Sequence, residues 1–342
     1  MSSSAATTVF RTCPLCEATC GLELTVADGA VTRIRGDSDD VFSAGFICPK
    51  GTTLGHLHDD PDRLRGPLVR RDGELRAATW EEAFAEVARR LPPIVARHGR
   101  DAVAVYVGNP TVHNLSGTLY SRVLLRALGT RNVFTASTVD QRPKEISSAL
   151  MFGTMLSHAV PDLDRTSYLL LLGANPLASN GSLATAPDWP GRLRRIRERG
   201  GTVVVVDPKR THTAERASEH VPIRPGSDAQ LLMAMVHTLF AERLVDLGRA
   251  AEFVAGVEVV EGLARDFTPE AVARLCGIDP VTIRRLAREL AAAPRRRSTG
   301  APGPARRSSG RWRAGSSTSS TCSRATWTAP AARCSPSRPL AR

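Results

Sequence analysis

Four cysteines near the start of this 342-residue sequence have the type and the spacing to bind a metal centre. Cys13, Cys16, Cys20 and Cys48 follow the pattern C-x2-C-x3-C-x27-C. Three thiolates in one short loop can cover one face of a cubane cluster, and a distant fourth completes the site, because each iron takes one soft thiolate. A structural zinc site usually shows two separated CxxC pairs, so the spacing favours [4Fe–4S] over zinc. The other alternative, four unligated thiols, would be a liability because exposed thiols react.

Polar turns that follow apolar segments indicate a second kind of chemistry. The turns GANP and DPKRT contain Gly173, Asn175, Pro176, Asp207, Arg210 and Thr211. Parallel sheets bind ligands at the carboxyl ends of their strands, where glycine permits close backbone approach and helix N-termini attract phosphate. An acidic side chain there can pair with a guanine edge or a ribose hydroxyl. Any doubly wound domain carries polar residues at such positions, so the turns alone predict a ligand edge without identifying the ligand.

Secondary structure to position these residues can be predicted from the hydrophobic pattern. Residues 22–37 and 68–80 are typical of β-hairpins, each turning at an Asp-Gly pair. Thr79 and Glu82 then match a capping box that starts a helix. Further helices are expected over 114–129, 144–152, 192–201, 270–276 and 280–292, and another from Ser227 or Asp228. Apolar strands alternate with these helices, which predicts an α/β fold with a parallel sheet covered on both faces.

Charge is concentrated at one end of the sequence. The formal net charge is +12, but residues 295–342 hold eleven Arg and no Lys, Asp or Glu, which leaves +1 for residues 1–294. A nucleic-acid-binding body therefore has little electrostatic support. No apolar run reaches the 18–20 or so residues of a membrane helix, and the N-terminus shows no secretory signal or twin arginine, so we expect a cytoplasmic protein without a membrane span.

Four of the seven cysteines lie within the first 48 residues, which favours a metal centre over a disulfide framework, and Cys276 is expected in the core.

The segments CPLCEATC and FICPKG resemble the N-terminal cluster domain of molybdopterin-dependent oxidoreductases, the group that includes formate dehydrogenases and prokaryotic nitrate reductases. The resemblance implies that Lys50, two residues after the fourth cysteine, lies between cluster and pterin and aids electron transfer; the alternative is a solvated surface lysine. The two polar turns resemble the family's binding turns for molybdopterin guanine dinucleotide. Further positions that match cofactor contacts of the family are Gly108, Asn109, Asn114, Gly226 and Asp228. A helix cap is the alternative role of Asp228.

The same resemblance points to a molybdenum ligand. In this family a side chain after a short strand commonly binds the metal, and in NVFTASTVDQRPK the ligand position falls on Asp140. A carboxylate is a hard oxygen ligand that suits high-valent molybdenum. The alternative is that Asp140 caps a helix and the metal is ligated otherwise. Gln141 stands where formate dehydrogenases have a histidine, which weakens the formate interpretation.

The architecture implied by the resemblance has four parts. They are a [4Fe–4S] domain (1–62), the first segment of a split α/β domain (63–140), a Rossmann-like pterin-dinucleotide-binding domain (141–294) and a disordered basic tail (295–342). The tail's codons permit a second reading that resembles the family's next segment, so we hypothesise a frameshift near Arg295, which resequencing of the gene would test; the alternative is a genuine RNA-binding extension. The family normally continues with the rest of the split domain and a β-barrel, so a truncated form is expected.

The expected activity is two-electron redox chemistry on a small-molecule substrate at molybdenum bis(molybdopterin guanine dinucleotide). Electrons would leave singly through the pterin, Lys50 and the [4Fe–4S] cluster to a redox partner protein or domain. Two alternatives remain at this point, namely a non-catalytic iron–sulfur or zinc-binding module and a basic-tailed nucleic-acid-binding protein.

Overall fold

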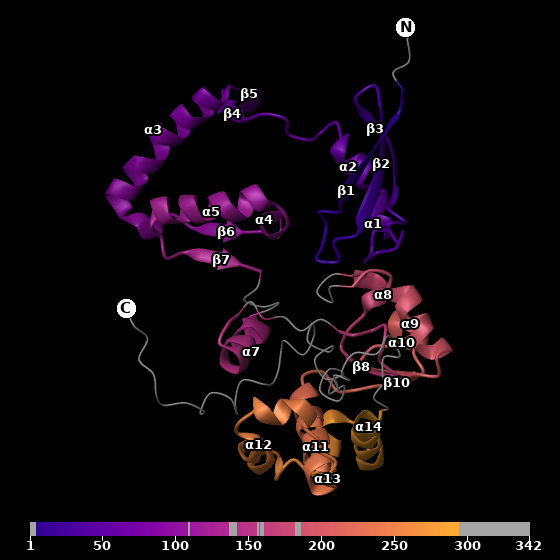
Figure 1. Cartoon of the computed structure of the whole chain (residues 1–342). Helices are drawn as coiled ribbons and strands as arrows, with labels where there is room; N and C mark the ends of the chain where they lie inside the picture. Colours follow the sequence, from indigo (N-terminus) through magenta and orange to yellow (C-terminus); the bar gives the residue numbers. More distant parts are fainter. Residues whose placement is uncertain are drawn as a thin grey trace. The chain divides into compact units, whose positions relative to one another are not determined.

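The computed structural model describes residues 5–108, 110–136, 142–155, 157, 161–181 and 186–293. These residues belong to two compact units, one within Met1–Thr138 and the other within Val139–Arg342 (Figure 1). The predictions that concern Asn109, Asp140, Gln141 and the tail 295–342 lie outside the described residues. Each unit is described separately below.

An antiparallel sheet with strand order β1-β2-β3 opens the first unit. Its strands span Thr7–Thr12 (β1), Gly21–Ala27 (β2) and Ala30–Gly36 (β3), followed by the short helices Pro49–Thr52 (α1) and Leu54–His58 (α2). Strands β2 and β3 turn at Asp28 and Gly29, whose φ angles of +49° and +78° are those of a tight two-residue turn. The predicted hairpin is therefore confirmed.

The second part of this unit contains a hairpin, three α-helices and a small parallel sheet. Its elements are Leu68–Arg71 (β4), Glu74–Ala77 (β5), Trp80–His98 (α3), Arg100–Ala102 (η1), Val105–Val107 (β6), Pro110–His113 (α4), Leu115–Leu128 (α5) and Val133–Thr135 (β7). The capping box predicted for α3 is present, with Glu82 N–H donating to Thr79 Oγ1 and Thr79 N–H donating to Glu82 Oε2. Helix α5 ends at Gly129, whose left-handed conformation (φ +62°) suits glycine.

The second unit is built around a three-stranded parallel sheet with strand order β10-β9-β8. Its elements are Arg142–Phe152 (α7), Tyr168–Leu172 (β8), Pro176–Ser179 (α8), Trp189–Glu198 (α9), Thr202–Val206 (β9), His212–Glu215 (α10), Glu219–Val221 (β10), Asp228–Ala241 (α11), Gly248–Glu252 (η2), Val257–Ala264 (α12), Pro269–Cys276 (α13) and Pro280–Ala292 (α14). In the described residues, no helix combines the length and the apolar character needed to cross a bilayer.

Both faces of this sheet are buried, as the apolar strands predict. Alternate residues of β8 and β9, such as Leu170 and Val204, pack with α11, α13 and α14. The residues between them, such as Leu171 and Val205, pack on the other side against Ile196 of α9. Because neighbouring side chains of a strand point to opposite faces, a continuous apolar run is what a sheet covered on both sides requires.

Strands β1 and β10 were not predicted from the sequence. Strand β10 has only three residues, one of them charged, and its strand state arises from pairing with β9, where Glu219 lies opposite Val204. Helix α9 begins three residues earlier than predicted, because the Asp188 carboxylate accepts the N–H of Gly191 at 2.9 Å and caps the helix. Tertiary pairing and local capping thus set these boundaries.

Candidate functional site

The loop between β1 and β2 brings three of the four cysteines together. Cys13 N–H donates to the Cys20 carbonyl at 2.8 Å and closes the base of the loop. Within it, Thr19 N–H donates to the Cys16 carbonyl at 3.2 Å, and Thr19 adopts a positive φ of 47°. This strained turn folds the chain back so that the thiols of one short segment converge.

The fourth cysteine joins the other three from the start of α1. The N–H groups of Gly51 and Thr52 donate to the Cys48 carbonyl and fix its backbone. Repulsion from the Cys48 thiolate raises the pKa of Cys13, Cys16 and Cys20, after the larger effect of burial. Burial together with repulsion from the other three cysteines raises the pKa of Cys20 to about 11. All four thiols therefore lie within electrostatic reach of one another.

Lys50 lies at the edge of this cysteine group and is exposed. Its positive charge lowers the pKa of both Cys13 and Cys16 against the opposing effect of burial. The ammonium group is therefore close enough to act on the thiols while it remains in contact with solvent. The predicted place of Lys50 between cluster and pterin stays a prediction.

An apolar shell supports the cysteine loop. Leu22 is 1% exposed and packs with Cys13 and Cys20, and Ile47 lies against the same group. A Cβ added at Gly51 would lie 2.7 Å from Ile47 Cγ1, so the chain after Cys48 needs glycine there. Cys13 and Cys20 are each 7% exposed within this shell, and an apolar shell of this kind controls solvent access at a metal site.

Across the described ranges, no three or more His, Cys, Asp or Glu side chains are gathered so that they could hold a single metal ion. The four cysteines offer one thiolate for each iron of a cubane cluster, which is the donor set that such a cluster takes.

The second candidate site lies at the carboxyl ends of β8 and β9. A depression of about 280 Å³ opens there, lined by Asn175, Leu177, Ala178, Lys209, Arg210, Thr211 and His212. Gly173 N–H donates to the Val206 carbonyl at 2.8 Å and ties the turn after β8 to the end of β9. The structure thus brings together Asn175, Arg210 and Thr211, three residues selected from the sequence. Lys209 and His212 of the same lining were missed, although their place in a cation-rich turn was a usable signal.

The neighbouring predicted residues have mainly local roles in this structure. The buried Asp207 carboxylate accepts the N–H of Lys209 at 2.8 Å, and Thr211 Oγ1 accepts the N–H of Ala214 and caps α10. Gly226 has a φ of +80° in the turn that follows β10, and Ser227 is the N-cap of α11, so Asp228 is its first helical residue. These turns all follow parallel strands of one sheet and so share its carboxyl edge.

Gly108 and Asn114 belong to the first unit. Gly108 follows β6, and its carbonyl accepts the N–H of Thr111 at 3.3 Å. Asn114 caps α5, because its Oδ1 accepts the N–H of Gly117 at 2.7 Å. The structure does not describe Asn109 or Asp140, so their predicted roles stay predictions.

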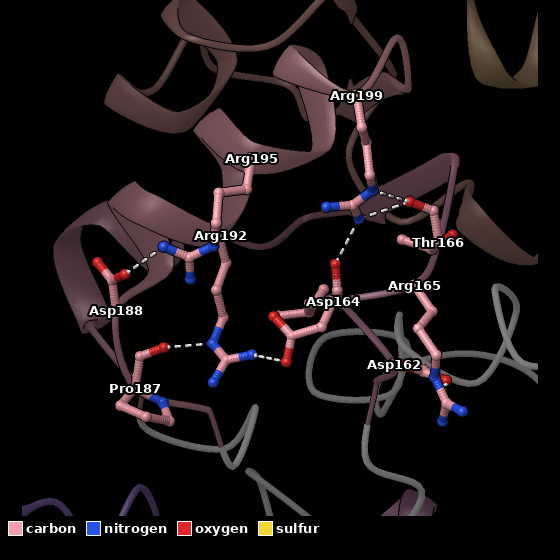
Figure 2. A network of polar contacts seen from close by, with 10 residues as sticks. Asp162, Asp164, Arg165, Thr166, Pro187, Asp188, Arg192, Arg195 and Arg199 are labelled. Atoms are coloured by element: carbon pink, nitrogen blue, oxygen red, sulfur yellow. Dashed lines mark hydrogen bonds and ion pairs between the residues drawn. The ribbon is translucent and has the colours of Figure 1, made fainter. Parts of the chain in front are cut away.

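A polar network that the sequence did not reveal anchors α9 to the segment before β8. Arg192, which is 9% exposed, donates to the Pro187 carbonyl at 2.7 Å and pairs with Asp164 at 2.5 Å. Arg199 donates twice to the Thr166 carbonyl, at 3.1 and 2.6 Å. Figure 2 shows both arginines reaching from one helix to the chain that precedes β8. The network ties α9 to the chain that leads into β8.

Comparison with protein families decides which family these features represent. A family model described as molybdopterin oxidoreductase matches residues 63–285, and another described as molybdopterin oxidoreductase Fe4S4 domain matches residues 7–58. The chain belongs to the molybdopterin oxidoreductase family. The match confirms the resemblance, the α/β fold with an N-terminal [4Fe–4S] domain, and molybdopterin as the cofactor of the family. The zinc-module alternative is not supported.

Individual molybdopterin oxidoreductases that resemble this chain differ in what their names say they act on. Formate dehydrogenase H of Escherichia coli is 28% identical over 83% of this chain and 40% of its own length. The thiosulfate reductase molybdopterin-containing subunit PhsA of Salmonella typhimurium is 29% identical over 82% of this chain and 36% of its own. The structure of acetylene hydratase from Pelobacter acetylenicus shares the fold, with a TM-score of 0.68 and 24% identity over 83% of this chain and 39% of its own. The chain thus spans about two fifths of these relatives.

Proposed function

We propose that this chain carries the cluster-binding and pterin-binding elements of an oxidoreductase that uses molybdenum bis(molybdopterin guanine dinucleotide). The depression at the ends of β8 and β9 is the observation that supports this proposal most directly. Its described lining holds two cations, Lys209 and Arg210, together with the amide of Asn175 and the hydroxyl of Thr211, and no carboxylate. Such a set of donors suits the charged oxygens of a pyrophosphate.

The remaining predicted residues complete the proposed site. Asp207 would pair with a guanine edge or a ribose hydroxyl. Gly226 and Asp228 would contact the same cofactor from the turn after β10, and Gly108, Asn109 and Asn114 would do so from the first unit. Asp140 would supply an oxygen ligand to molybdenum.

We assign electron transfer to the cysteine group of the first unit. Cys13, Cys16, Cys20 and Cys48 would hold the [4Fe–4S] cluster, and bound molybdenum would supply two-electron chemistry. Lys50 holds a positive charge beside the cysteines and would stabilise electron density that passes between pterin and cluster. A redox partner protein or domain would accept the electrons. The substrate is proposed as a small molecule only, because the relatives' names point to different ones.

Binding of GDP, which carries the same guanosine diphosphate group as the cofactor, tests the proposal. Calorimetry on the full chain should detect binding that Arg210→Ala weakens about tenfold, the lower end of what a hydrogen bond to a charged group contributes, since Arg210 is exposed. Arg194→Ala is the matched control, because this exposed arginine of α9 lies outside the lining and pairs with Glu198 at 3.4 Å. Absence of GDP binding, or equal losses in both variants, would contradict the proposal.

A further inference from the structure

A buried threonine that does not line the depression joins the two turns that do. Thr213 is 0% exposed and lies in α10, two residues after Thr211. Its Oγ1 accepts the N–H of Leu177 at 3.2 Å and donates to Oδ1 of Asn175 at 2.8 Å. Leu177 and Asn175 both belong to the turn after β8 and both line the depression. One hydroxyl therefore connects the segment after β9 to two residues of the neighbouring turn.

The Thr213 hydroxyl binds one particular end of the Asn175 amide. Its oxygen accepts from the Leu177 N–H, and its single proton is donated to the carbonyl oxygen Oδ1 of Asn175. The nitrogen Nδ2 keeps both of its hydrogens and has no protein partner among the described residues. The unbound end of the Asn175 side chain, which lines the depression, is therefore a hydrogen-bond donor and not an acceptor.

We propose that Thr213 is a positioning residue that holds Asn175 with its amide nitrogen free, so that the depression selects ligands rich in oxygen acceptors. The inference rests on the proposed function, since the acceptors are the diphosphate oxygens of a guanine nucleotide. Lys209 and Arg210 supply charge to the same depression but are exposed to solvent. The oriented amide adds a donor whose direction is fixed before the ligand arrives, which lowers the entropy lost on binding.

The arrangement also makes the two turns one rigid edge. Thr213 bonds the turn after β8 at Leu177 and Asn175, and Gly173 N–H bonds the Val206 carbonyl at 2.8 Å. Loss of the hydroxyl would leave the Leu177 N–H without its partner and allow the Asn175 amide to rotate. The expected result is weaker ligand binding with the sheet intact.

The test compares GDP binding by the full chain and five variants. Thr213→Val removes the hydroxyl but keeps the shape, and should raise the GDP dissociation constant about tenfold, equivalent to about 1.4 kcal/mol. Thr213→Ser keeps the hydroxyl and should stay within about threefold of the wild type. Thr238→Val is the matched control, because Thr238 is 2% exposed and its hydroxyl donates to the Ala234 carbonyl of the same helix, α11, at 2.9 Å. It should bind GDP like the wild type.

A positioning role also predicts the behaviour of Asn175→Leu. If Thr213 acts through Asn175, then Asn175→Leu should lose about as much affinity as Thr213→Val, and the double variant should lose no more than either one. Equal GDP affinity of the wild type and Thr213→Val would overturn the inference, as would additive losses in the double variant. If Thr213→Val fails to fold, Asn175→Leu still tests the inference. A GDP affinity of Asn175→Leu equal to that of the wild type would then overturn the inference. No GDP binding by the wild type would refute the proposed function itself, and with it the inference.

Discussion

Replacing Lys50 by glutamine should lower the reduction potential of the cluster. Lys50 is the cation whose charge acts on both Cys13 and Cys16. Reduction adds one negative charge to the cluster, and a nearby positive charge stabilises the reduced form. Glutamine keeps a polar side chain of similar length but removes the positive charge. The reduced form of the cluster should therefore become less favourable.

The size of the shift follows from the exposure of Lys50. Two unit charges 4 Å apart in water interact by about 1 kcal/mol, and greater separation or salt reduces this energy. Because Lys50 is in contact with solvent, the value for water is the appropriate one. The potential of a one-electron couple shifts by about 59 mV for each factor of ten in the equilibrium constant, which corresponds to about 1.4 kcal/mol. We therefore expect the potential of Lys50→Gln to fall by about 20–40 mV.

A redox titration followed by electron paramagnetic resonance measures this shift on the purified chain. Lys50→Arg keeps the charge and should stay within about 10 mV of the wild type. Arg35→Gln removes an exposed charge from β3 and serves as the matched control. A potential for Lys50→Gln that is unchanged, or higher than that of the wild type, would refute the reasoning.

Three further predictions concern the cysteines, helix α9 and the tail. Cys20→Ser should lose most of its bound iron, whereas Cys276→Ser, at a buried cysteine of α13, should keep it, as measured by iron analysis. Gly191→Ala should lower the free energy of unfolding, measured by urea denaturation, by about 1–2 kcal/mol, because the added Cβ would lie 2.1 Å from the carboxylate that caps α9. Gly262→Ala is the control and should not be destabilised, because its added Cβ meets nothing within 4 Å. Nucleic acid retained by the full chain should dissociate in salt and be lost on removal of residues 295–342, which hold eleven arginines.

Much of the fold follows from local signals in the sequence. The Asp-Gly turns, the capping box and the glycine that ends α5 depend on a few adjacent residues, and each is found where it was predicted. Strand β10 depends instead on its neighbour β9, since the segment EHV carries no pattern of its own. The Arg192–Asp164 pair likewise joins residues 28 positions apart, which no local pattern indicates.

The candidate site was predictable to a similar degree. The cysteine spacing identified all four thiols, and the position of two turns at strand ends identified Asn175, Arg210 and Thr211. The contribution of Thr213 could not be predicted, because it depends on how two turns 38 residues apart approach each other. The sequence thus indicates which residues line the depression better than it indicates which residues orient them.

The central claim is that the four cysteines hold an iron–sulfur cluster in a protein that also binds molybdenum. Metal analysis of the anaerobically purified full chain tests it most directly. The account predicts about four irons for each chain, together with molybdenum. Zinc as the sole bound metal would contradict it.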